Sequence, residues 1–134
     1  MRMRCIPVVF SYLLSALFAA CGSDARLGDL RLASGIDGAG RPVGETTVFR
    51  PGETVYLSIE LLEAYQGLES TATWKRGDET LATQTAAASR AADALDPLFI
   101  VFQLETGADW PPGHYRCEVF IPDQGTTTLE FTLE

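Results

Sequence analysis

The sequence predicts an all-β protein, an antiparallel β-sandwich of seven or eight short strands. Hydrophobic and polar residues alternate with period two in many short segments, which is typical of strands with one buried face. Turn-forming residues separate these segments, and no stretch shows the periodicity of a long amphipathic helix. The chain has 134 residues, which suits a single domain.

The expected strands follow one another along residues 29–134, the range assigned to the sandwich domain. They are Asp29–Ser34, Thr46–Phe49, Val55–Leu62, Thr71–Lys75, Glu79–Thr85, Leu98–Leu104, Tyr115–Ile121 and Leu129–Leu133. Residues 37–44 are rich in glycine and proline, so we expect turns there. For the alanine-rich residues 85–94 we expect a loop or a single helical turn.

The N-terminal residues have the pattern of an export signal. Arg2 and Arg4 precede residues 6–20, which carry no charge. As a helix this segment would span about 22 Å, less than the roughly 30 Å of a bilayer's hydrocarbon core. Residues 1–20 are therefore interpreted as a signal peptide.

The residues that follow resemble the lipobox of bacterial lipoproteins. Ala19 and Ala20 precede Cys21, although Phe18 occupies the position at which that family usually has leucine. The resemblance implies a lipid on Cys21, a membrane anchor, and residues 21–28 as a tether. Gly22 after the cysteine favours the outer membrane or cell surface over the inner membrane. Ordinary signal cleavage, which would release a soluble secreted protein, is the alternative.

The distribution of charge argues against one class of partner, and the cysteine content argues against a disulfide. All 18 acidic residues follow Cys21, and no basic cluster accompanies them, which argues against nucleic acid as a partner.

Cys5 lies in the signal peptide and Cys21 would carry the lipid. Cys117 is then the only remaining cysteine, so the domain has no internal disulfide and we expect the Cys117 thiol to be buried.

The order of motifs resembles that of the immunoglobulin superfamily. In chain order, the segments that carry the resemblance are Gly52–Ile59, Ala72–Gly77, Leu98–Phe102, Asp109–Cys117 and Gly125–Leu133. Ile59 stands where the family has its first cysteine, so the disulfide between the sheets is missing. Pro112-Gly113-His114-Tyr115 is similar to a turn found in disulfide-free bacterial modules of this type.

The resemblance also implies a core. Trp74 should pack against Ile59 and Cys117 across the roughly 10 Å that separates two packed sheets. The hydroxyl of Tyr115 should donate a hydrogen bond back to the turn that precedes it, as in a tyrosine corner.

The sequence offers no catalytic, cofactor or metal site. His114 is the only histidine, and there is no Gly-x-Ser-x-Gly nucleophile motif for it to serve. His114 and Cys117 would face opposite sides of a strand. Residues 37–40 faintly resemble a calcium loop, and Asp93 and Asp96 add carboxylates, but loop turns explain both segments better.

Apolar residues on outer strand faces are the candidate partner surface, because exposed hydrophobic clusters often mark interaction sites. These residues are Tyr56, Leu62, Phe99 and Val101 on two neighbouring strands, and Phe120 on the other sheet. The alternative is that the tether or the alanine-rich loop covers them.

The sequence therefore predicts a non-enzymatic, envelope-anchored binding or scaffolding module for a protein partner. One alternative is a carbohydrate-binding or adhesion module that uses Trp110 and Tyr65 in end loops. Another is an accessory or inhibitor domain of an envelope enzyme.

Overall fold

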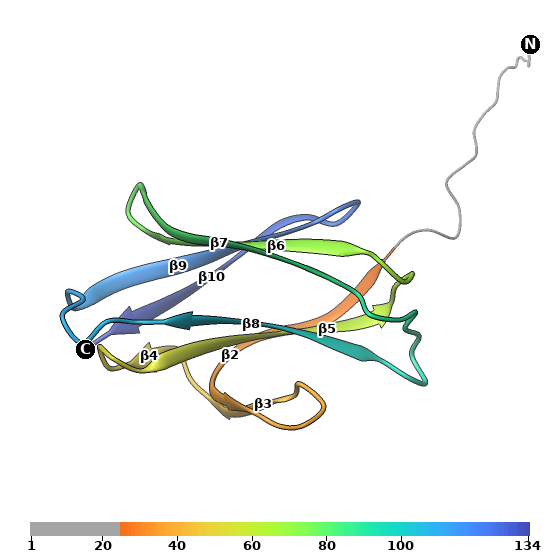
Figure 1. Ribbon diagram of the computed structural model, residues 1–134, viewed down its shortest axis with the longest axis horizontal. Coiled ribbons are helices and arrows are strands. Elements are labelled where there is room, and N and C mark those ends of the chain that lie inside the picture. The colour runs from red at the N-terminus through yellow and green to blue at the C-terminus, as the bar shows by residue number, and fades with distance from the viewer. Residues whose placement is uncertain (1–24) are drawn as a thin grey trace, which may run out of the picture.

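The computed structural model describes residues 25–134, so the expected signal peptide and Cys21 lie outside the described residues. This part of the chain consists of strands and connecting turns (Figure 1). The strands are β2 (Arg26–Ile36), β3 (Pro42–Glu45), β4 (Val48–Phe49), β5 (Thr54–Glu63), β6 (Glu69–Arg76), β7 (Glu79–Ala87), β8 (Leu98–Glu105), β9 (Gly113–Ile121) and β10 (Gly125–Leu133). The described residues form no helix long and apolar enough to cross a bilayer.

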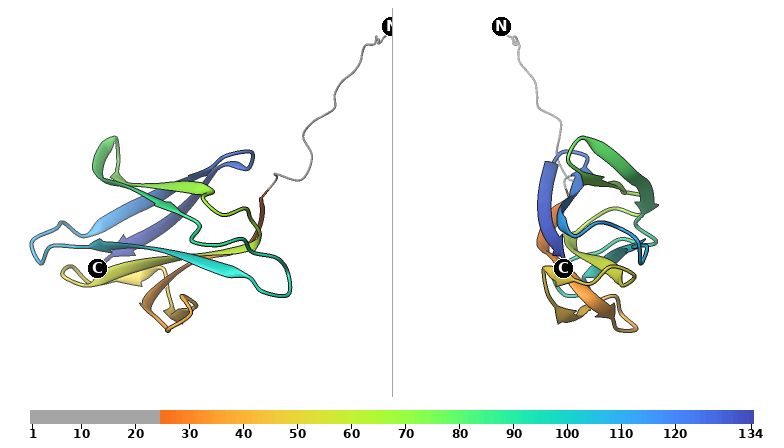
Figure 2. Two further views of the ribbon diagram at one scale, coloured as in Figure 1. Left: turned by 45° about the vertical axis from the view of Figure 1, so that its right-hand side comes forward. Right: turned by 90° about the vertical axis from the view of Figure 1, so that its left-hand side faces the viewer.

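Two sheets face each other, which confirms the predicted β-sandwich (Figures 1 and 2). One sheet has the order β4-β10-β9-β6-β7 and the other β3-β2-β5-β8. β5 pairs with β8 in the smaller sheet, and β6 pairs with β9 in the larger one. All pairs are antiparallel except β4 with β10, which is parallel.

The core lies between the sheets and contains the four residues expected there. Ile59, Trp74 and Cys117 are fully buried, and Tyr115 is 3% exposed. Trp74 is the direct cross-strand partner of Cys117, and its ring meets that of Phe131 edge-on at 6.1 Å. Apolar packing therefore fills the place where the superfamily has its disulfide.

The tyrosine corner is present. The Tyr115 hydroxyl donates a hydrogen bond of 2.7 Å to the backbone carbonyl of Pro111. The ring stacks on Phe131 on one side and on Trp110 on the other. Gly113 makes the turn possible, since its φ of 140° is one that residues with a side chain rarely adopt. The contact fixes the β8–β9 loop to the core.

The first part of the domain differs from the expectation in two ways. β2 begins at Arg26 and Ala25 is buried, so the folded domain already includes residues expected to be tether. A further short strand, β3, overlaps the residues expected to form only turns, and makes a hairpin with the end of β2. After β3 the chain crosses to the other sheet as β4.

The alanine-rich segment also differs. β7 continues to Ala87, and the following residues form turns and isolated bridges, not a helical turn. Ala64 and Ala92 exchange two backbone hydrogen bonds of 2.9 Å, which join the β5–β6 and β7–β8 connections.

Candidate binding surfaces

The strand register places the expected apolar residues of the smaller sheet on its outer face. Val101 is paired with Ser58, and Phe99 with Glu60, while Tyr56 is on the same face of β5. Their side chains are half-buried. This burial comes from a segment that packs over the sheet, so the face is not an open hydrophobic surface.

The loop between β2 and β3 provides that cover. The Ser58 hydroxyl donates a hydrogen bond of 2.6 Å to the carbonyl of Gly40, which anchors the loop at the middle of the sheet. Gly40 has a φ of 96°, and a Cβ atom there would lie 2.8 Å from Cβ of Phe99. The Arg41 guanidinium lies 5.1 Å from the centre of the Phe99 ring. The outer face is therefore covered, as in the alternative to an exposed partner surface, but by this hairpin and not by the tether or the alanine-rich loop.

Asp37 shapes the covering loop. One oxygen of its carboxylate accepts hydrogen bonds of 2.9 Å from the backbone N–H groups of Ala39 and Arg41. These bonds, above all the one from Arg41, hold the pKa of Asp37 below its ordinary value. The segment that faintly resembled a calcium loop is thus a turn closed by its own aspartate.

The remaining two residues of the candidate partner surface do not extend it into one patch. Leu62 is half-buried near the end of β5. Phe120 is 49% exposed, but it belongs to β9 and so to the other sheet. The five residues therefore lie on two faces, and no single apolar surface unites them.

Beside the covering loop lies a polar hollow of about 390 Å³. Arg31 contacts Asp29 at 2.9 Å and Glu45 at 2.7 Å, and both carboxylates raise the pKa of its guanidinium. Glu60 and Phe99 line the hollow further along the face. Arg31 is thus already paired twice, whereas Arg41, which also lines the hollow, lies over the Phe99 ring.

β7 is an edge strand with an unusual composition. It pairs with β6 on one side only, so its other side presents unpaired backbone N–H and C=O groups. Residues 80–89 contain neither a charged residue nor a proline. Native edge strands are commonly protected by such residues, because a bare edge invites another strand to pair with it.

Gln84 links this edge to the rest of the sandwich. Its side-chain oxygen accepts a hydrogen bond of 2.9 Å from the indole N–H of Trp74. Its amide nitrogen donates one of 2.7 Å to the backbone carbonyl of Gln103 in the opposite sheet. The side chain therefore bridges β7 and β8, and holds the edge strand in place.

The two aromatic residues expected to stack on a sugar lie far apart. Tyr65 is 44% exposed in the β5–β6 connection, near the start of β2. Trp110 lies in the β8–β9 loop at the other end of the sandwich, where its ring stacks on Tyr115 at 6.0 Å. The structure thus does not bring the two rings together as one platform.

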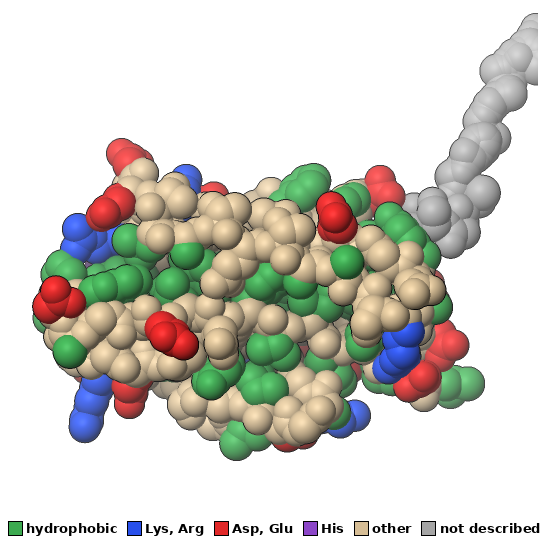
Figure 3. All heavy atoms as spheres, viewed as in Figure 1, with side chains coloured by type: hydrophobic (Ala, Val, Ile, Leu, Met, Phe, Trp, Pro, Cys, Tyr) green, Lys and Arg blue, Asp and Glu red, His purple; other side chains and the backbone are tan. Residues whose placement is uncertain are grey.

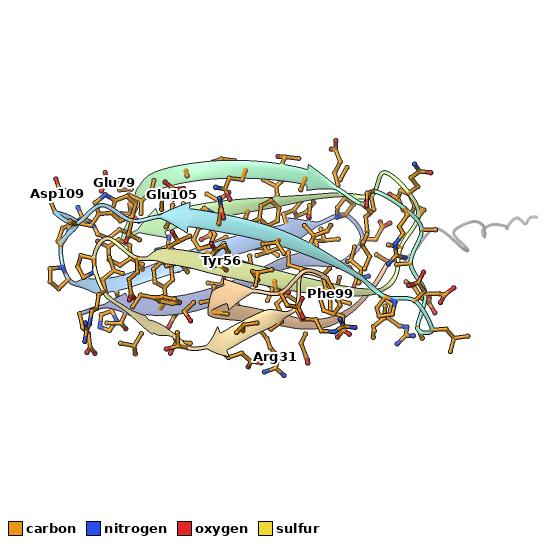
Figure 4. All side chains as sticks on the ribbon, turned by 60° about the horizontal axis from the view of Figure 1, so that its bottom comes forward. Arg31, Tyr56, Glu79, Phe99, Glu105 and Asp109 are labelled. Carbon is orange, nitrogen blue, oxygen red and sulfur yellow. The ribbon has the colours of Figure 1, made fainter. Side chains whose placement is uncertain are left out.

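The titratable and nucleophilic groups are dispersed. His114 is exposed on the outer face of β9, whereas Cys117 points inward, and burial raises the pKa of its thiol to about 12. Asp93 accepts two backbone hydrogen bonds and Asp96 pairs with Arg90. Residues 25–134 contain no group of three metal-ligating side chains close enough to hold an ion. The acidic side chains of Glu79, Glu105 and Asp109 lie toward the end opposite Ala25 (Figure 4).

No family model matches the sequence, and no curated protein matches it. Among solved structures, the C-terminal domain of wzt is 14% identical, with a TM-score of 0.45; the match covers 84% of this chain and 74% of that one. Spo0M, a sporulation control protein from Bacillus subtilis, is 10% identical with a TM-score of 0.39, and the match covers 79% and 49%. At these identities the likeness concerns the fold alone.

Proposed function

We propose that this chain is a non-enzymatic binding module of the bacterial envelope, anchored by a lipid on Cys21, which holds a protein partner by strand addition to β7. The observation that carries the proposal is the unprotected edge of that strand. In strand addition, the affinity comes from main-chain hydrogen bonds between the two strands. β7 is nine residues long, and its free N–H and C=O groups can form such bonds along its edge.

The other sheet edges support the choice of β7. β4 has only two residues, and β3 has four and begins with Pro42. The parts of β2 and β10 that β3 and β4 leave unpaired carry charged residues, among them Arg31 and Glu130. At the β8 edge, the carbonyl of Gln103 already accepts the side chain of Gln84. β7 therefore offers a long edge whose side chains are small or uncharged after Glu79.

An extended protein segment fits this edge better than a sugar does. Thr83, Thr85 and Ala87 are exposed and small, so a neighbouring strand can approach closely along the whole edge. Sugar recognition would need exposed aromatic rings, and Tyr65 and Trp110 lie at opposite ends. The partner expected here is a protein with an uncharged, extended segment.

A photo-cross-linking experiment tests the proposal. A photoreactive amino acid is placed at Ala87 of the full-length protein, and the cells that produce it are irradiated. Lysines at an edge oppose strand pairing, so Thr83→Lys/Thr85→Lys should abolish the adduct. The double variant Thr126→Lys/Thr128→Lys is the matched control, because it adds the same charge to the exposed face of β10, toward the opposite side of the same sheet from β7.

The expected result is a discrete adduct that persists in the β10 variant and disappears in the β7 variant, with equal thermal stability of both. The proposal is overturned by the absence of an adduct at Ala87, or by an adduct that tolerates both edge lysines. Incorporation of radiolabelled palmitate, lost in Cys21→Ser, tests the anchor separately.

A further inference from the structure

We infer that the end of the sandwich that contains Ala25 rests on the membrane surface, with Leu95 inserted at the lipid–water interface. This inference rests on the lipid anchor of the proposed function. It adds a second, non-covalent membrane contact that fixes the orientation of the domain relative to the membrane.

The structure fixes where the described chain leaves the domain. The carbonyl of Ala25 accepts a hydrogen bond of 2.7 Å from the side chain of Gln124, in the turn between β9 and β10. Arg26 contacts Glu63 at the end of β5 at 3.5 Å. Four residue steps separate Cys21 from Ala25, and even a fully extended chain of that length spans only about 14 Å. A lipid on Cys21 would therefore hold this end close to the bilayer.

Three exposed large hydrophobic side chains lie at the same end, whereas two others, Val43 and Val48, lie on β3 and β4. Leu95 is 98% exposed in the β7–β8 connection, and Tyr65 is 44% exposed in the β5–β6 connection. Phe120, 49% exposed, precedes the last residue of β9. Green side chains project at the right-hand end of the space-filling view, beside the start of the described chain (Figure 3). Leucine and tyrosine suit the boundary between headgroups and acyl chains.

The turn that presents Leu95 is well ordered by hydrogen bonds. The Asp93 carboxylate accepts the backbone N–H groups of Leu95 and Asp96 at 2.9 and 3.0 Å. Arg90 donates to the carbonyl oxygens of Ala91, Asp96 and Pro97. The leucine is therefore held outward by a braced turn, and its insertion requires no rearrangement of the loop.

The lipid anchor makes so small a contact effective, because tethering turns the second binding event into an intramolecular one. The charges near Leu95 favour a zwitterionic surface over an anionic one. Asp93 and Asp123 flank this end, and the nearest arginines, Arg26 and Arg90, are each paired with a carboxylate.

Depth-dependent fluorescence quenching tests the inference. The lipidated full-length protein, with Ala94→Cys labelled by an environment-sensitive dye, is reconstituted into phosphatidylcholine vesicles that contain brominated lipid. Ala108→Cys, exposed in the β8–β9 loop at the opposite end, is the matched control. Cys117 does not interfere, since its thiol is fully buried.

We expect a blue shift and loss of fluorescence for the dye at residue 94 and neither at residue 108. Adding Leu95→Asp should remove both effects at residue 94. Equal, water-like fluorescence at the two positions in protein shown to be acylated overturns the inference while the anchor stands. Absence of acylation at Cys21 instead overturns the anchor itself.

Discussion

At the residue scale, Trp74 connects the two sheets of the sandwich without a disulfide. Its indole is fully buried between them. Through Gln84, its N–H group is also connected to the backbone of the opposite sheet. The residue thus combines a large apolar contact with a satisfied polar group, as buried tryptophan requires.

We predict that Trp74→Ala destabilises the domain by about 3–5 kcal/mol, because it leaves a large cavity and removes the partner of Gln84. Urea unfolding followed by far-UV circular dichroism measures the loss. Trp110→Ala is a useful comparison, since Trp110 lies at the edge of the core and should cost less. An unchanged urea midpoint in the Trp74→Ala variant would contradict the prediction.

At the scale of elements, period-two alternation was sufficient to predict most strands. In β5, Val55, Leu57 and Ile59 are all buried, as their spacing indicated. β3 was not predicted, because Pro42 and Gly44 have the composition of a turn and the strand is stabilised only by its pairing with β2. Such tertiary pairing leaves no local signal in a four-residue segment.

The candidate surface was harder to predict than the strands. Alternation correctly placed Phe99 and Val101 on an outer face, but it cannot show what packs over that face. The cover depends on the contact of Gly40 with Ser58, between residues distant in sequence. The opposite positions of Tyr65 and Trp110 likewise depend on strand directions, and the composition of their loops does not encode them.

The covering hairpin should respond to acid. The pKa of Asp37 is lowered in the folded state by its backbone hydrogen bonds. Its stabilising contribution is therefore complete above the ordinary aspartate pKa of about 4 and is lost as the pH falls through the lower, folded value. The amide resonances of Ala39 and Arg41 should report this transition in NMR spectra. In Asp37→Asn these resonances should not titrate; an unchanged transition in that variant would assign it to another group.

At the scale of the whole molecule, the reactivity of the Cys117 thiol reports on global unfolding. Its thiol is fully buried, and burial raises its pKa to about 12, so the native state holds it inaccessible and protonated. We predict that its reaction with Ellman's reagent is slow and accelerates with urea in parallel with global unfolding. The thiol of Ala94→Cys, in an exposed loop, should react at once. Rapid reaction of Cys117 that is independent of urea would reveal local opening of β9 instead.

The path of the chain through β2, β3 and β4 has a mechanical consequence. β2 is hydrogen-bonded to β5 in one sheet, and β4 is hydrogen-bonded to β10 in the other. A force applied at Ala25 is therefore transmitted to both sheets through the continuous backbone from β2 to β4. If a partner bound at β7 were pulled away from the membrane, the force would act on both sheets. The two sheets would then unfold together and not one after the other.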